Sequence, residues 1–233
     1  MTEGLNPMDL TGVSFWLLSA AMTAATFFFF MERDRAVGKW KTSLSVAALV
    51  TGIAAIHYFY MRGVWVSTGE SPTTYRYVDW LLTVPLQIIE FYLILAAIAV
   101  VRAALFWKLL VASVVMLVFG YLGEIGQMSA WPAFIIGTIA WLYIIYEIFF
   151  GEASKINSDH GTAASQTAFN ALRWIVTIGW AIYPIGYVLG IGDSGSAADL
   201  NLVYNLADFV NKIAFGVVIW SAATSESAAS GKG

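Results

Sequence analysis

The sequence predicts an all-α membrane protein, a bundle of seven transmembrane helices, and three observations support this fold class. The 233 residues are 59% hydrophobic and 12% charged, which is too apolar for a soluble domain of this length. Apolar stretches recur along the chain, each near the ~20 residues that cross a bilayer core as a helix. Basic residues gather on alternate connections between these stretches. Seven spans leave no room for a soluble domain, so we expect a single domain over residues 1–233.

The expected spans follow one another with short connections. They lie at roughly 9–31, 42–63, 76–100, 103–126, 131–150, 167–190 and 201–224. The first has no small-residue cleavage pattern behind it, so it counts as a true span rather than a signal peptide. Residues 64–75 begin with an alternating pattern and contain Gly69 and Pro72, which indicates a short hairpin. We expect residues 152–165 to be a solvated connection, and the Ala/Ser/Gly-rich segment from Ala222, residues 222–233, to be a cytoplasmic tail end.

The basic residues indicate the orientation of the chain in the membrane. Those on one side are Arg33, Arg35, Lys39, Lys41, Arg102, Lys108 and Lys155. The other side offers only Arg62, at the end of a span. Because cytoplasmic loops are enriched in lysine and arginine, we expect the N-terminus outside and the C-terminus in the cytoplasm, with the chain in the bacterial inner membrane.

Composition also excludes several kinds of site. The sequence has no cysteine, so disulfides and thiolate metal centres are impossible. It shows no internal repeat, no glycine-rich phosphate loop and no cluster of metal ligands, so we predict no metal site.

Lys212 is the most informative single residue, because it lies within the last apolar span. An ammonium at the centre of a bilayer costs at least ~2.5 kcal/mol. Asp208 is four positions earlier and therefore on the same helix face. A buried amine beside a carboxylate can hold an aldehyde covalently as a charged imine. The alternative is an ion-paired or snorkelling lysine with only a structural role.

The third span carries two acids, Asp79 and Glu90. Eleven residues separate them, which is close to three helical turns, or roughly 16 Å along the axis. Both carboxyl groups therefore face one way, and Thr83 lies one turn from Asp79 on that face. Two intramembrane acids and an amine on another helix are the components of a proton relay. Asp79 and Asp208 lie on the outer side of Lys212, and Glu90 on the inner side.

Three motifs in these spans carry a family resemblance. They are Arg-Tyr-x-Asp-Trp-Leu-Leu-Thr-x-Pro-Leu over residues 76–86, Trp-Ala-Ile-Tyr-Pro over residues 180–184, and Asp208-x-x-x-Lys212. Their order resembles that of the microbial (type 1) rhodopsins, and the chain is most similar to the blue-absorbing proteorhodopsins, span for span. The resemblance implies a light-driven outward proton pump, an ion transporter rather than an enzyme, with all-trans-retinal bound to Lys212 as a protonated Schiff base.

The resemblance also implies residue roles. Asp79 would be the counterion and proton acceptor, with Asp208 and Arg76 completing the counterion complex. Glu90 would be the proton donor, and His57 would tune the acceptor. For three of these, blander readings stay open: an interfacial anchor for Arg76, an interhelical hydrogen bond for Glu90 and a packing role for His57.

Two features depart from the haloarchaeal proton pumps. Those pumps carry aspartate where this chain has Glu90, and they have a pair of outer glutamates for proton release. Here only Glu124 lies near the outer end of the fourth span, so the resemblance leaves the release group unassigned.

Aromatic and small residues near the motifs would form a central retinal pocket. The expected cofactor-binding residues besides Lys212 are Trp80, Thr83, Gln87, Met116, Gly120, Trp131, Phe134, Trp180, Tyr183, Pro184 and Tyr204. Proteorhodopsins with leucine at the position of Gln87 absorb green light and those with glutamine absorb blue, which implies a blue-absorbing pigment. A glutamine that only hydrogen-bonds a neighbouring helix is the alternative.

Oligomerisation and other functions complete the expectations. Similar proteins form rings in which a tryptophan and a histidine meet across protomers, so we expect a homo-oligomer, pentamer or hexamer, with a contact at Trp16 and His57. A sensory photoreceptor rhodopsin that signals through a partner is the main alternative, and Glu90 argues against it because sensors usually lack a carboxyl donor. A chloride pump would lack Asp79, and a retinal-free transporter would not colour with retinal.

Overall fold

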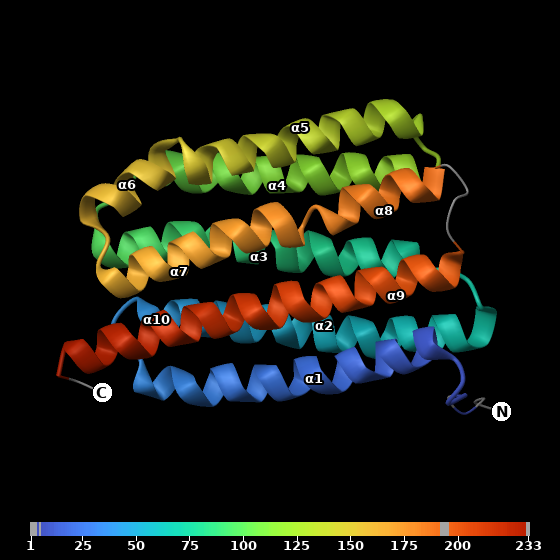
Figure 1. The fold of residues 1–233 in the computed structure, drawn as a ribbon, viewed down its shortest axis with the longest axis horizontal. Coiled ribbons are helices and arrows are strands. Elements are labelled where there is room, and N and C mark those ends of the chain that lie inside the picture. The colour runs from blue at the N-terminus through green and yellow to red at the C-terminus, as the bar shows by residue number, and fades with distance from the viewer. Residues whose placement is uncertain (1–3, 5, 192–195, 232–233) are drawn as a thin grey trace.

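The computed structural model describes residues 4, 6–191 and 196–231, and these form a bundle of long helices that lie side by side (Figure 1). Seven helical segments are long and apolar enough to cross a membrane. The predicted fold class is therefore confirmed, and the described residues contain no strand.

Several spans are built from more than one helical segment. The segments are α1 (Leu10–Glu32), η1 (Arg33–Arg35), α2 (Trp40–Thr68), α3 (Thr73–Ile98), α4 (Ala103–Glu124), α5 (Ala130–Phe149), α6 (Glu152–His160), α7 (Ala163–Trp174), η2 (Ile175–Gly179), α8 (Ile182–Ile191), α9 (Ala197–Asp208), η3 (Phe209–Ala214) and α10 (Phe215–Ala229). The fifth span combines α5 and α6, the sixth runs from α7 to α8, and the seventh from α9 to α10. The two ends of the chain lie at opposite ends of the bundle (Figure 1), here called the N-terminal end and the C-terminal end.

The predicted hairpin at residues 64–75 is wrong. Residues 64–68 are the last turns of α2, which ends at Gly69 in the left-handed conformation, φ 68°. Trp65 is buried, and its Nε1 donates to Asp9 Oδ2 at 2.8 Å. The apparent alternation was thus a helix face that packs on the start of α1, and four residues are too few to separate the two periods.

The two predicted solvated connections are also largely helical. Residues 152–160 form α6, whose first N–H group, that of Glu152, is satisfied by Glu147 Oε1 at 2.8 Å. The segment from Ala222 continues α10 to Ala229. Ser227 in it is buried and accepts a hydrogen bond from the backbone of Val37 at 3.0 Å. Small side chains permit this close packing. Composition alone had indicated a cytoplasmic tail end for this segment.

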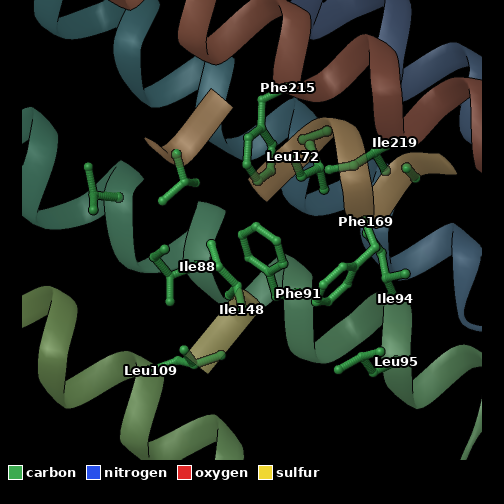
Figure 2. Packing of buried hydrophobic residues seen from close by; sticks show 14 of the residues in the cluster. Ile88, Phe91, Ile94, Leu95, Leu109, Ile148, Phe169, Leu172, Phe215 and Ile219 are labelled. Carbon is green, nitrogen blue, oxygen red and sulfur yellow. The ribbon is translucent and has the colours of Figure 1, made fainter. Parts of the chain in front are cut away.

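A large apolar cluster fills the bundle towards its C-terminal end, and Figure 2 shows its centre. Ile88, Phe91, Ile94 and Leu95 of α3 are fully buried there, and side chains from α4, α5, α7 and α10 surround them. The rings of Phe91 and Phe169 meet edge to face at 5.3 Å. Because lipid tails are as apolar as these side chains, close van der Waals packing is what holds the helices together here.

Two helical segments, η2 in the sixth span and η3 in the seventh, have the wider π-helical winding. They contact each other across the bundle. Single-turn π segments within α-helices are often found at functional sites. Lys212 lies in η3.

Candidate functional site

Lys212 lies between two carboxylates inside the bundle. Its side chain is 2% exposed, and Nζ forms ion pairs with Oδ2 of Asp79 from α3 and, at 2.9 Å, with Oδ2 of Asp208. Both aspartates are fully buried. A buried ammonium is tolerated only when it is paired and hydrogen-bonded, and the fold supplies this pairing.

The two aspartates differ in their other partners. Asp208 accepts hydrogen bonds from the hydroxyls of Tyr58 and Tyr183, each at 2.6 Å, and from Nε1 of Trp80, at 3.3 Å to each oxygen. Asp79 Oδ1 has no hydrogen-bond partner within the described part of the chain. Hydrogen bonds to a charged form stabilise it, so the negative charge of Asp208 is held more firmly than that of Asp79.

His57 approaches Asp79 without forming a hydrogen bond to it. Nδ1 is 3.0 Å from the carbonyl oxygen of Ile53 and 3.8 Å from Asp79 Oδ1. A carbonyl only accepts, so Nδ1 carries the hydrogen, and 3.8 Å exceeds hydrogen-bond range. His57 therefore lies beside Asp79 without a direct hydrogen bond to it in this structure.

Arg76 lies inside the bundle, so the reading as an interfacial anchor is wrong. It is 2% exposed. Nη2 donates to Asn201 Oδ1 at 2.7 Å and to Asn205 Oδ1 at 3.0 Å, and Nη1 donates to the Tyr58 hydroxyl at 3.2 Å. Since Tyr58 in turn donates to Asp208, Arg76 is linked to the counterion pair through one tyrosine.

Glu90 has a very different environment from Asp79, although both belong to α3. It is 1% exposed, and neither carboxyl oxygen has a hydrogen-bond partner among the described residues. An isolated carboxylate is expensive to bury, so this surrounding tolerates the neutral, protonated acid. The interhelical hydrogen bond considered from sequence is not formed here.

A cavity with Lys212 among its lining residues lies between α3, α4, α5, the sixth span and the seventh span. Nine predicted pocket residues line it besides Lys212: Trp80, Gln87, Met116, Gly120, Phe134, Trp180, Tyr183, Pro184 and Tyr204. Lining residues that the sequence analysis missed include Tyr77, Val84, Leu117, Gly137, Thr138, Trp141 and Tyr187. Most of its lining residues are apolar or aromatic, and Lys212 supplies an amine.

Two predicted pocket residues do not line this cavity. The Thr83 hydroxyl donates to the backbone carbonyl of Asp79 at 2.9 Å, within its own helix. Trp131 is 54% exposed and meets the ring of Phe134 edge to face at 6.0 Å. Because α5 is apolar on all faces, the sequence does not indicate whether Trp131 faces the cavity or the outside of the bundle.

Sequence reasoning also missed polar residues that complete the site, namely Tyr58, Asn201, Asn205 and Asn211. One signal was available for two of them. Positions 201, 205, 208 and 212 are spaced by three or four residues, so their side chains form a polar stripe on one face of the seventh span. Tyr58 and Asn211 lie outside any such pattern.

This fold, with a buried lysine between two aspartates at the end of an apolar cavity, is that of the microbial rhodopsins, and comparisons with known proteins agree. The chain belongs to the bacteriorhodopsin-like family, since the family's description, bacteriorhodopsin-like protein, matches residues 9–226. Among its relatives, the green-light absorbing proteorhodopsin of Gamma-proteobacterium EBAC31A08 is 62% identical over 96% of this chain and 90% of its own. The blue-light absorbing proteorhodopsin of Gamma-proteobacterium Hot 75m4 is 57% identical, again over 96% and 90%.

A solved structure of similar sequence has the same fold. The blue light-absorbing proteorhodopsin from Med12 superimposes with a TM-score of 0.82 at 58% identity, covering 94% of this chain and all of that one. The predicted family is thus confirmed. The chain is a multi-pass membrane protein, and its relatives include both green- and blue-absorbing forms.

The residues present fit the retinal chromophore that membership of a rhodopsin family implies. Retinal is a long conjugated polyene with an aldehyde at one end. The lining of the cavity is mostly apolar, with many aromatic side chains, and Lys212 is the one amine among its described lining residues. Tyr183 and Tyr204, which stack at 6.1 Å, form part of one wall. The apolar and aromatic lining of the cavity therefore suits the polyene, and Nζ suits the aldehyde.

Proposed function

We propose that this protein is a light-driven outward proton pump with all-trans-retinal on Lys212. The observation that carries the proposal is the contrast among its three buried acids. Asp208 is held by several donors, Asp79 has a free oxygen beside Lys212, and Glu90 lies on the opposite side without any partner in the described chain. Such an arrangement suits one fixed charge, one proton acceptor and one proton store.

Retinal, when held at Nζ of Lys212, would supply the absorption of light and an isomerisation that changes the proton affinity of Nζ. The rest of the work falls to the chain. Asp79 takes the proton from Nζ, because its Oδ2 is paired with Nζ and its Oδ1 is open. Asp208 stays charged through Tyr58 and Tyr183, so the amine always keeps one counterion.

Glu90 returns a proton to Nζ from the other side. A donor must hold its proton until it is needed, and a buried carboxyl without partners does so. We propose further that His57 tunes the proton affinity of Asp79, and that Arg76 stabilises the counterion pair through Tyr58. Transfer through Asp79 on one side and Glu90 on the other gives the movement its direction.

We propose the same orientation as the basic residues indicate. The N-terminal end, with Asp79, would be outside, and the C-terminal end, with Glu90, would face the cytoplasm of a bacterial cell whose inner membrane holds the protein. Outward transport then works against about 2.3 kcal/mol per 100 mV of membrane potential for each proton. We also propose that residues 1–233 act as one domain. Protease protection of each terminus tests the orientation.

We propose blue absorption, because Gln87 lines the cavity beside Lys212. Its side chain is 1% exposed, and Nε2 donates to the backbone carbonyl of Asn211 at 3.2 Å. The amide therefore has a fixed orientation, as a tuning dipole needs. The hydrogen bond to a neighbouring helix, which was the alternative reading, coexists with the position in the cavity wall.

We also propose a pentameric or hexameric ring with a contact at Trp16 and His57. Trp16 is 47% exposed on α1, and a fifth of the His57 side chain is exposed on α2. Native mass spectrometry in mild detergent should show five or six copies. A single monomeric species in several detergents and in lipid discs would contradict the ring.

One experiment tests the central proposal. Cells that express the chain and receive retinal should acidify their medium under light, and a protonophore should abolish the signal. Flash spectroscopy of the same protein should show a deprotonated and then a reprotonated pigment. A coloured protein that cycles without any change in external pH would favour a sensory photoreceptor instead.

A further inference from the structure

Asn211 is a buried polar residue beside Lys212 that the mechanism above does not use. It lies in η3 and is 2% exposed. Its Nδ2 donates to the backbone carbonyl of Gly179 at 3.0 Å and to the hydroxyl of Tyr183 at 3.2 Å. An amide nitrogen has two hydrogens, so both are used, and both go to the sixth span.

These contacts fix the direction of a hydrogen-bond chain. The Gly179 carbonyl can only accept, so the atom facing it is the amide nitrogen. That nitrogen can only donate, so the Tyr183 oxygen must accept from it. The single hydroxyl proton of Tyr183 is then left for Asp208 Oδ1 at 2.6 Å. A hydroxyl that accepts one hydrogen bond becomes a stronger donor in the next.

The close approach of the amide depends on Gly179. A Cβ atom at this position would lie 3.0 Å from Cγ of Asn211 and closer still to its Oδ1. The missing side chain thus lets the Asn211 amide rest against the backbone of η2. The backbone carbonyl of Asn211 accepts a hydrogen bond from the side-chain amide of Gln87 in α3. Asn211 therefore joins three spans at the level of Lys212.

We propose that Asn211 is a positioning residue: it holds the Tyr183 hydroxyl proton on Asp208 and so maintains the negative charge beside Lys212. Asn211 acts through Tyr183 and does not itself exchange a proton. The inference rests on the proposed function in that its main assay reads the colour of the retinal pigment.

The first test is a titration of that colour in the full chain with retinal. We expect the colour to change on acidification, when one of the two carboxyl groups beside Lys212 takes up a proton. Asn211→Leu keeps the size of the side chain but removes both N–H donors. Weaker support of the charge makes protonation easier, so the midpoint should rise by about one pH unit, which corresponds to ~1.4 kcal/mol.

Thr177→Val is the matched control. Like Asn211→Leu it removes a polar hydrogen, here from η2, but the Thr177 hydroxyl donates to the carbonyl of Arg173 within the sixth span at 2.7 Å. Its midpoint should equal that of the parent. An unchanged midpoint in Asn211→Leu, or an equal shift in Thr177→Val, would overturn the proposal.

A double-mutant cycle separates positioning from general packing. Tyr183→Phe removes the hydroxyl through which Asn211 acts, so adding Asn211→Leu to it should shift the midpoint no further, within about 0.3 pH units. Additive shifts would mean that Asn211 acts by another route.

If Asn211→Leu fails to give pigment, Gly179→Ala addresses the same contact. The added methyl group must displace the Asn211 amide, so the midpoint should rise as well. In an Asn211→Ala background, where the methyl group has room, Gly179→Ala should add no shift. A shift of equal size in both backgrounds would contradict the proposal.

A readout without retinal keeps this inference separate from the proposed function. In the apoprotein labelled with ¹³C-tyrosine, the Cζ signal of Tyr183 reports the hydrogen bonding of its hydroxyl. It should move in Asn211→Leu and stay in Thr177→Val. Failure of the parent to form pigment would refute the proposed function alone, whereas an unmoved Cζ signal in Asn211→Leu would refute the role of Asn211.

Discussion

The two halves of the bundle, on either side of Lys212, are built in opposite ways. Towards the N-terminal end, Arg76, Tyr58, Asn201, Asn205 and Ser14 form a chain of hydrogen bonds, the last from Asn205 Nδ2 to Ser14 Oγ at 2.8 Å. Towards the C-terminal end, Glu90 has no such partner, and the apolar cluster of Figure 2 fills the space.

The difference shows where protons can move without a change in packing. On the N-terminal side, linked hydroxyl, amide and guanidinium groups reach Asp208 through Tyr58, so polar groups lie close to the ion pairs of Lys212. A proton can reach Glu90 only if the packing around Phe91 and Leu95 loosens or admits water, because burying an unpaired charge there is costly. We therefore expect the two sides to exchange protons with Lys212 at different times, as a pump requires.

The largest expected effect comes from removing Lys212, which lies between the two halves. Lys212→Ala deletes the only amine among the described residues that line the cavity, so it should abolish visible absorption with retinal, while the apoprotein still inserts in the membrane. Absorption spectra after retinal addition, with membrane extraction as the control for insertion, measure this. Persistent visible pigment would remove the central claim.

A smaller and sharper effect distinguishes the two aspartates. Asp79→Asn should stop deprotonation of the pigment and shift its absorption to the red, because a counterion charge is lost. Its thermal stability should fall less than that of Asp208→Asn, since Asp79 Oδ1 has no described hydrogen-bond partner to lose and Lys212 still pairs with Asp208.

Asp208→Asn is the matched comparison. Its new amide group would face the donors Tyr58, Tyr183 and Trp80 and leave at least one of them unpaired. An unsatisfied buried donor costs ~1–3 kcal/mol, so the pigment should bleach at a lower temperature. Equal thermal bleaching of the two variants would contradict the asymmetry between the aspartates.

The third prediction concerns Glu90, in the half towards the C-terminal end. Glu90→Gln should slow reprotonation of the pigment by ~10²-fold or more, the usual size of general acid catalysis, and leave deprotonation intact. Flash spectroscopy resolves the two steps.

Glu147→Gln provides the control for this variant. Glu147 is also a buried carboxyl towards the C-terminal end, but it accepts a hydrogen bond from the Glu152 backbone, which glutamine can also accept. Its cycle should match that of the parent. Normal reprotonation and pumping in Glu90→Gln would show that the donor role is wrong.

The sequence predicts most of the seven-helix fold and the charged centre of the site, because intramembrane charges are few and costly. Lys212, Asp79 and Asp208 could be placed together from helical spacing and the family motifs. Tyr58 and Asn211 could not, since polar residues without charge are common in membrane helices and their partners come from distant spans. The hairpin error arose because the alternation covers only four residues, which are too few to distinguish a strand from the last turns of a helix that ends before Gly69.

The smallest predicted effect concerns colour, at the point where the two halves meet. Gln87 belongs to the wall of the cavity, and its amide is fixed by the carbonyl of Asn211. Light moves positive charge of the chromophore away from the amine, so a dipole that favours the ground-state distribution widens the energy gap. Gln87→Leu removes this dipole and should shift absorption to the red, by on the order of 1–3 kcal/mol in excitation energy, the scale of a hydrogen bond to a charged group. Pumping should persist, because no proton passes through the amide. If the spectrum of Gln87→Leu superimposes on that of the parent, Gln87 does not set the colour, and the fixed orientation of its amide serves only to join α3 to η3.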